Sequence, residues 1–309
     1  MISVVIPLYN KERQIINTLK SVINQTFRDF EIVIVDDGST DNSINLVKEF
    51  EDRRITIISQ VNQGVSVARN TGIEKAKYDY IAFLDADDEW EPFYLQTQVN
   101  LIQDYPTCDV FACAYQFRTY KGDLKPIKLS KMPFSGETGI LTNYFTVASC
   151  SHPPLWTSAV TAKKEALLSV GGFLLGVKAG EDLLMWARLA VKYAIAYNKN
   201  SLSIYNVSPS ESYENPPSRC PQENDLVGKE LKKLYEKNKS LNGLKNYVAH
   251  WYKMRAAMFL LFGDKKKTLR ESMQSLKYNP TNIRVWAYVL LLLFPKFFRY
   301  KTFQTLGNQ

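Results

Sequence analysis

The segment YIAFLDADD, residues 80–88, decides both the fold and the first candidate site of this chain. A short apolar run, typical of a buried strand, ends in three carboxylates within four residues. Unpaired carboxylates are costly to bury, so such a cluster normally lies where something positive meets it. Asp85 and Asp87 are spaced so that two oxygen donors could converge on one divalent cation. The alternative is an acidic, solvated turn, and the neighbouring segments decide between the two.

Short β-rich runs recur upstream of this segment. The sequence predicts strands over residues 2–7, 31–35, 54–58 and 80–84, alternating with helices over residues 15–23, 44–50 and 64–76. Asn10 is expected to cap the first of these helices. Strands that alternate with helices in this way indicate an α/β fold with a parallel, doubly wound sheet.

Polar side chains follow the ends of three of the predicted strands. Tyr9 comes after the first strand, Asp37 after the second, and Asp85 and Asp87 after the fourth. Ligands of doubly wound sheets bind outside the carboxyl ends of the strands. Because unrelated acidic turns would not gather along one edge of one sheet, this placement favours a ligand site.

Four spaced motifs carry a family resemblance. They are VVIPLYN at residues 4–10, VDDGSTD at 35–41, NQG at 62–64 with ARNTG at 68–72, and FLDADD at 83–88. In this order they resemble family 2 glycosyltransferases of the bacterial cell-surface glycan type. The resemblance implies the GT-A fold, a mostly parallel, doubly wound sheet, and usually inversion at the anomeric carbon. It covers about the first two-thirds of the chain.

A nucleotide-sugar donor presents a base, a ribose, a diphosphate and a sugar. Asp37 could accept the N3–H of uracil, or it could serve as an Asx turn or helix cap. By the resemblance Asp37 reads the base, while Pro7 and Tyr9 line its pocket; Tyr9 could instead simply pack at a strand end. Arg69 is expected to pair with the diphosphate or with a carboxylate of the site, the alternative being a surface arginine.

The acidic cluster is the predicted metal site. Asp87 is the main expected ligand, and Asp85 is its partner or a donor contact through water or the ribose. Mg²⁺ or Mn²⁺ suits an oxygen-only site and would neutralise charge on the leaving nucleoside diphosphate. Asp88 is expected to be only a turn or helix-start residue.

A second group of motifs lies downstream. GGF at residues 171–173 precedes GEDLLMWARLA at 180–190, in which Glu181 and Asp182 open a predicted helix. Acidic residues also suit the positive end of a helix dipole, which is the alternative role. By the resemblance Asp182 is the catalytic base that takes the proton of the acceptor hydroxyl, and Glu181 supports the acceptor or the base.

Other features narrow the class of protein. The Gln-x-x-Arg-Trp motif and the membrane spans of large processive family members are missing from this sequence, which favours a single-addition transferase. The four cysteines have no Cys-x-x-Cys spacing and fit a reduced, cytoplasmic set. No signal peptide precedes the first predicted strand, so we expect a cytoplasmic protein, peripheral at the inner face of the plasma membrane if it binds membrane.

The C-terminal part differs in charge. We expect a GT-A domain over residues 1–207, a linker over 208–221 and a basic helical region over 222–309. That last region carries 17 lysines and arginines against 6 aspartates and glutamates, whereas the rest of the chain carries 22 and 25. An anionic partner is indicated, and no motif favours nucleic acid. Residues 283–301 could lie on an anionic membrane surface or fold onto neighbouring helices.

The predicted function is metal-dependent transfer of one sugar, by single displacement with inversion. The donor is a nucleotide-sugar, expected to be a UDP-sugar, and the acceptor is a hydroxyl of a glycan or lipid-linked glycan. The alternative is a catalytically silent relative that binds nucleotide-sugar or membrane without transfer. The complete set of Asp85, Asp87 and Asp182 argues against that alternative.

Overall fold

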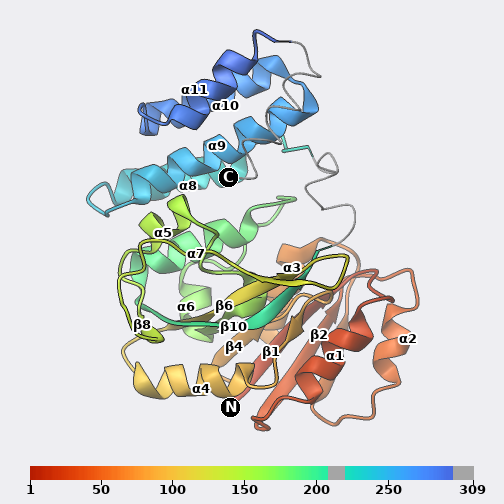
Figure 1. Cartoon of the computed structure of the whole chain (residues 1–309). Coiled ribbons are helices and arrows are strands. Elements are labelled where there is room, and N and C mark those ends of the chain that lie inside the picture. Colours follow the sequence, from red (N-terminus) through yellow and green to blue (C-terminus); the bar gives the residue numbers. More distant parts are fainter. Residues whose placement is uncertain (208–219, 295–309) are drawn as a thin grey trace.

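The computed structural model describes residues 1–207 and 220–294. One mixed sheet lies among helices; α8 and α9 pack on α7 and α5, and α10 and α11 lie on the far side of α9 (Figure 1). The α/β fold expected from the sequence, a mostly parallel doubly wound sheet followed by helices, is therefore confirmed.

The N-terminal part alternates strands with helices as predicted. Its elements are β1 (Ile2–Leu8), α1 (Ile15–Ile23), β2 (Phe30–Asp36), α2 (Ser43–Lys48), β3 (Ile55–Ser59), α3 (Val65–Lys75) and β4 (Tyr80–Phe83). β1 pairs in parallel with β2 on one side and β4 on the other, and β2 pairs in parallel with β3. All residues of β1 and β2 are buried, as expected for parallel strands with both faces covered.

The middle of the chain completes the sheet with antiparallel and parallel strands. Its elements are β5 (Glu89–Trp90), α4 (Tyr94–Asp104), β6 (Val110–Arg118), β7 (Leu124–Pro126), β8 (Thr138–Ile140), α5 (Tyr144–Cys150), the 3₁₀ turn η1 (Thr157–Ala159), β9 (Val160–Lys163), α6 (Lys164–Ser169), α7 (Glu181–Lys192) and β10 (Ile195–Asn206). The described strand order is β3-β2-β1-β4-β9-β6-β10-β5. β9 lies antiparallel between β4 and β6, and β6 pairs in parallel with β10.

The expected cap at Asn10 is wrong. Helix α1 begins after Gln14, which makes no side-chain cap. Asn10 has a positive φ of 51°, and its side-chain oxygen accepts a 2.8 Å hydrogen bond from the Thr40 backbone N–H. Asn10 therefore joins the loops after β1 and β2, both of which lie at the edge of the sheet where the site was predicted.

The C-terminal helices share the hydrophobic core of the sheet domain. They are α8 (Leu226–Lys237), α9 (Leu244–Phe262), α10 (Lys265–Tyr278) and α11 (Ile283–Leu291). One continuous buried cluster runs from β1 and β4 through α7 to α9 and Tyr278 of α10. Among the described residues, every helix is too short or too polar to cross a bilayer. Residues 208–219 of the predicted linker and 295–301 of the predicted membrane segment lie outside the described residues.

Candidate active site

The carboxyl ends of β1 and β2 lie side by side, as the sequence predicts. Leu8 is in register with Asp36, and the Asp37 backbone N–H donates to the Leu8 carbonyl at 2.8 Å. Tyr9, directly after β1, is 45% exposed, so its ring is available to a ligand. Pro7 is buried within β1, opposite Val35. The part of these two residues in lining a base pocket stays a prediction.

Asp37 is buried and organises the loop after β3. Its carboxylate accepts hydrogen bonds from the Gln60 side-chain amide at 2.7 Å and from the backbone N–H groups of Gln63 and Gly64 at 3.0 and 2.8 Å. Gly64 has a φ of 91°, a conformation that favours glycine, and the next residue starts α3. Asp37 thus fixes the start of the helix that carries Arg69, and its role toward uracil stays a prediction.

Arg69 connects two regions that are far apart in the sequence. Its guanidinium donates to Asp85 Oδ1 at 2.6 Å and to Glu181 Oε1 at 3.0 Å, across 112 residues in the second case. Arg69 is only 4% exposed, and the two carboxylates raise its pKa further despite its burial. Arg69 therefore pairs with carboxylates of the site and is not a surface arginine.

Asp87 lies at the open side of the cluster. Its side chain is partly exposed and forms an ion pair with the ammonium group of Lys11, which follows β1. Burial, together with the charge of Asp87, raises the pKa of Asp85, although the Arg69 guanidinium opposes this shift. The two carboxylates predicted to bind metal therefore lie together, and each already faces a cation of the protein.

Asp88 has a larger structural role than the sequence suggested, and no helix starts there. It is buried, and its Oδ2 accepts hydrogen bonds from the Ser158 hydroxyl at 2.6 Å and the Trp156 indole N–H at 3.1 Å. The Asn206 backbone N–H donates to its other oxygen at 3.3 Å, and the Asn206 side-chain amide donates to the Asp87 carbonyl at 2.7 Å. Burial raises the pKa of Asp88 well above its usual value. Asp88 anchors the acidic turn to η1 and β10.

Glu181 and Asp182 begin α7, as predicted. Gly180 precedes them in the left-handed conformation, with a φ of 83°. The GGF segment before this turn is held by Asn70 of α3, whose amide bonds both the N–H and the carbonyl of Phe173. The side chain of Asp182 is partly exposed, but the protein around its carboxyl group displaces much of the water. This desolvation and the Glu181 charge raise the pKa of Asp182 to about 7, while the Arg69 charge opposes the shift.

A divalent cation fits the acidic turn in part. Mg²⁺ is usually bound by one or two carboxylates together with substrate phosphates and water, rather than by a complete protein cage. Asp87 offers a partly exposed carboxylate that pairs with the Lys11 ammonium group, so a metal ion would have to share or replace that partner. Among the described residues, no group of three or more His, Cys, Asp or Glu side chains could hold a metal by itself. Asp87 and Asp85 would therefore need ligand oxygens to complete the coordination.

The resemblance to family 2 glycosyltransferases is confirmed by comparison with known proteins. Residues 3–156 match the sequence profile of the family described as "Glycosyl transferase family 2". The chain therefore carries a family 2 glycosyltransferase domain.

Two curated relatives illustrate the similarity. The chain is 41% identical over 123 residues to "Glycosyltransferase GlyA" of Streptococcus pneumoniae, covering 39% of this chain and 18% of that protein. It is 36% identical, also over 123 residues, to "Putative teichuronic acid biosynthesis glycosyltransferase TuaG" of Bacillus subtilis, covering 39% of this chain and 46% of that protein. The chain thus matches less than half of the length of each relative.

Solved structures share the fold over nearly the whole chain. Residues 1–349 of S. aureus TarS, in complex with UDP-GlcNAc, superpose with a TM-score of 0.66 and 18% identity, covering 99% of this chain and 90% of that one. The mannosyltransferase PcManGT from Pyrobaculum calidifontis, in complex with GDP-Man and Mn²⁺, gives a TM-score of 0.57 at 18% identity, covering 98% and 84%. Both identities are low, so these two structures establish the fold alone.

Sequence reasoning missed several residues of the site. Lys11 lies in the loop that follows the first predicted strand, so its position near the sheet edge was a signal that could have identified it. Gln60, which bonds Asp37, follows β3 in the same way. Ser158 and Asn206 carried no such signal, because their contacts with Asp88 depend on how β9 and β10 join the sheet.

Proposed function

We propose that this protein is an inverting glycosyltransferase that moves one sugar from a nucleotide-sugar to an acceptor hydroxyl. The observation that carries the proposal is the double ion pair of Arg69 with Asp85 and Glu181. Through this pair the acidic turn after β4 and the start of α7 belong to one site. Membership of a glycosyltransferase family supports the reaction class.

Asp182 is the proposed catalytic base. An inverting displacement needs a base that takes the proton of the attacking hydroxyl on the face opposite the leaving group. A carboxyl group whose pKa is raised to about 7 is better matched to this proton than an ordinary aspartate. Glu181 neutralises Arg69 and raises the pKa of Asp182, so we assign it a supporting part.

The proposed donor is a UDP-sugar. The structure of TarS with UDP-GlcNAc has the same fold, and Tyr9 and Asp37 lie at the sheet edge where the base is expected. The proposed metal is Mg²⁺ or Mn²⁺ held by Asp87 with Asp85; it would stabilise negative charge on the departing nucleoside diphosphate. Arg69 keeps Asp85 in place, and Lys11 offers a second cation on the same side.

The proposed acceptor is a glycan or a lipid-linked glycan at an anionic membrane surface. The name of TuaG refers to teichuronic acid biosynthesis, which supports a glycan acceptor. The surface of α11 supports membrane binding, because Val285, Tyr288 and Leu291 are buried on one side of it. An exposed apolar stripe consists of Ile283, Trp286 and Leu290 of α11 and of Leu293 just after it. We propose that this stripe, with the basic residues of the region, lies on the membrane.

Substitution of Asp182 tests the proposal. Donor binding is measured by thermal shift across UDP-, GDP- and dTDP-sugars with Mn²⁺, and turnover by UDP release from the best UDP-sugar. Because a general base contributes about 10²–10⁴-fold, Asp182→Asn should reduce turnover by at least about 10²-fold and leave the thermal shift nearly unchanged. Asp87→Asn should instead weaken the metal-dependent shift.

Three results would contradict parts of the proposal. Unchanged turnover in Asp182→Asn would reject Asp182 as the base. Binding of UDP-sugar by the unaltered protein without any UDP release, with or without Mn²⁺, would favour the catalytically silent relative. A larger thermal shift with a GDP- or dTDP-sugar would overturn the assignment of UDP.

A further inference from the structure

One face of α9 contacts the first turn of α7. The Tyr247 hydroxyl donates a 3.0 Å hydrogen bond to the carbonyl oxygen of Leu183, the residue directly after Asp182. One helical turn further along α9, the Trp251 indole lies against Gly180, directly before Glu181. A methyl group added to Gly180 would come within 2.4 Å of that ring, so the contact is close. Tyr247 and Trp251 therefore hold the turn that carries Glu181 and Asp182 from both ends.

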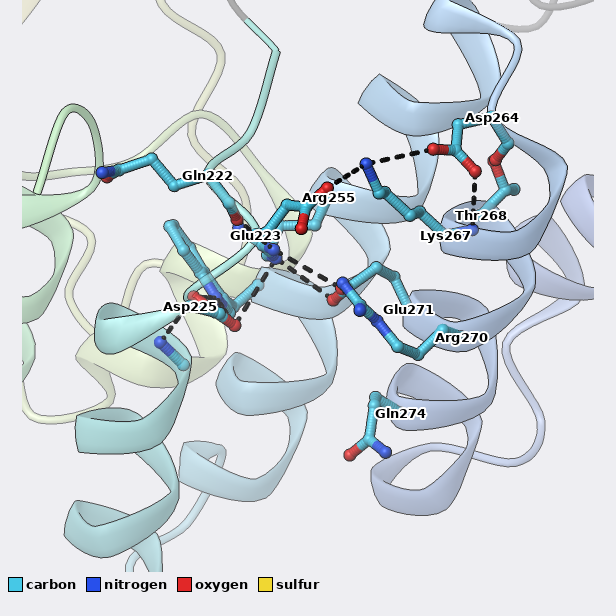
Figure 2. Close-up of polar contacts among 12 residues, drawn as sticks. Gln222, Glu223, Asp225, Arg255, Asp264, Lys267, Thr268, Arg270, Glu271 and Gln274 are labelled. Carbon is cyan, nitrogen blue, oxygen red and sulfur yellow. Dashed lines mark hydrogen bonds and ion pairs between the residues drawn. The ribbon is translucent and has the colours of Figure 1, made fainter.

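The position of Trp251 is in turn fixed by a buried charged network. Its indole N–H donates to both carboxylate oxygens of Asp225, at 3.1 and 3.2 Å. Asp225 also caps α8, accepting from the Gly228 backbone N–H at 2.9 Å. Arg255, two turns after Tyr247 on α9, lies 3.4 Å from Asp225 and 3.1 Å from Glu271 of α10. Figure 2 shows Arg255 between Asp225 and Glu271, so the network links three helices.

The charges in this network have little freedom to rearrange. Arg255 and Glu271 are both buried, and Arg255 also donates to the Gln222 carbonyl at 2.9 Å. Breaking a buried ion pair by removing one partner leaves an uncompensated charge, which is strongly unfavourable. The network therefore gives α9 a defined position against α8 and α10, and through Tyr247 and Trp251 that position reaches α7.

We infer that Tyr247 and Trp251, of which Trp251 is held by Asp225, are positioning residues for the base on α7. The inference rests on the proposed role of Asp182. The first-turn N–H groups of a helix have no partners inside the helix, so this end frays unless side chains packed against the turn hold it. A base must keep its oxygen within hydrogen-bonding reach of the acceptor hydroxyl. The C-terminal helices would thus contribute to catalysis through their contacts with α7.

Tyr247→Phe keeps the ring that packs in the core and removes the hydroxyl, which bonds Leu183 and also lies 3.5 Å from the Tyr144 hydroxyl. Tyr278→Phe is the matched control: Tyr278 is buried in α10 within the same hydrophobic cluster, and its ring packs on Tyr235 and Tyr252 of the C-terminal helices. Because small misplacements of catalytic groups cost up to about 10²-fold, we expect kcat for UDP release to fall about tenfold in Tyr247→Phe. The donor Kd should match that of Tyr278→Phe, whereas the melting temperature should fall slightly, because the buried Tyr144 hydroxyl loses its neighbour.

Trp251→Phe provides a second measurement should Tyr247→Phe fail to fold. It removes the indole N–H, and its smaller ring makes less contact with Gly180. Each folded variant should show a lower kcat with an unchanged donor Kd. A kcat equal to that of Tyr278→Phe in a folded variant would overturn the inference. If Asp182→Asn itself keeps full turnover, the proposed function fails instead, so the two failures are distinguishable.

Discussion

At the scale of single residues, the proposed base Asp182 should make activity sensitive to pH. The base must be ionised to accept a proton, and burial with the Glu181 charge raises its pKa to about 7. We therefore expect kcat to decrease about tenfold per pH unit below pH 7 and to level off above it. A pH profile of UDP release under saturating donor measures this midpoint; a profile that stays flat down to pH 5 would contradict the assignment.

The raised pKa of Asp182 also makes the free energy of unfolding depend on pH. Ionisation of Asp182, which the proposed reaction requires, lowers that free energy. A carboxyl group with a pKa above its unfolded value stabilises the folded state most when protonated, and this contribution is lost as the pH rises through about 7. Asp182→Asn removes the ionisation, so its free energy of unfolding should exceed that of the unaltered protein at pH 8. At pH 4, where the carboxyl is protonated, the two should be close. Chemical denaturation at both pH values tests the difference.

Arg69 is the cation on which the buried carboxylates depend. Arg69→Gln leaves Asp85 and Glu181 without their partner, which should destabilise the protein by about 3–5 kcal/mol. Because Arg69 also opposes the raised pKa of Asp182, the midpoint of the pH profile should move to higher pH. Arg54→Gln is the control, since Arg54 pairs with Asp52 in a more exposed position and should cost about 1 kcal/mol or less. Equal destabilisation by both substitutions would contradict this account.

At the scale of elements, α3 lies unusually close to β1. A methyl group added to Gly72 would come within 2.2 Å of a Val5 methyl carbon. Gly72→Ala should therefore destabilise the protein by about 1–3 kcal/mol through overpacking. It should also lower donor binding, because α3 carries Arg69 three residues earlier.

A second substitution identifies the cause. Val5→Ala removes the methyl groups that an alanine at position 72 would meet, so the double variant should be more stable than the sum of the two single effects predicts. Gly136→Ala is a suitable control, since its added methyl would find its nearest neighbour at 3.6 Å, an ordinary contact. Strictly additive effects of Val5→Ala and Gly72→Ala would show that crowding against β1 is not the reason.

The sequence predicts the elements of the N-terminal sheet well, and local chemistry explains why. Strands such as β1 and β2 are apolar runs ended by proline or aspartate, and their parallel pairing follows from the alternation with helices. The insertion of β9 between β4 and β6 was not predictable, because antiparallel pairing of β9 depends on contacts between distant residues. The buried role of Asp88 was missed for the same reason, since Ser158 and Asn206 reach it only after that insertion.

At the scale of the whole molecule, α11 presents an apolar stripe to solvent. Ile283, Trp286, Leu290 and Leu293 are 82%, 47%, 60% and 81% exposed. If the stripe lies on a membrane, the double variant Ile283→Ser with Leu290→Ser should bind anionic vesicles at least about tenfold more weakly. Co-sedimentation with phosphatidylglycerol vesicles measures the loss.

A control variant and two solution conditions distinguish binding to an anionic membrane from nonspecific hydrophobic adsorption. Leu168→Ser is the control, because Leu168 is 51% exposed on α6, an element outside the basic C-terminal region. Binding should weaken as salt increases, and it should be much lower on neutral phosphatidylcholine vesicles. Equal binding to both kinds of vesicle, or an equal loss in Leu168→Ser, would reject the proposed surface.

The hydrophobic core that runs from the sheet into α9 has a consequence for engineering. The boundary predicted near residue 207 suggests that the C-terminal helices could be exchanged between relatives as an independent unit. Such chimeras would place a foreign α9 against the native α5 and α7. The packing of the Tyr144 and Phe145 rings on Tyr247 would then be lost. A chimera that exchanges α5, α7 and the C-terminal helices together would keep these packing contacts within one source sequence.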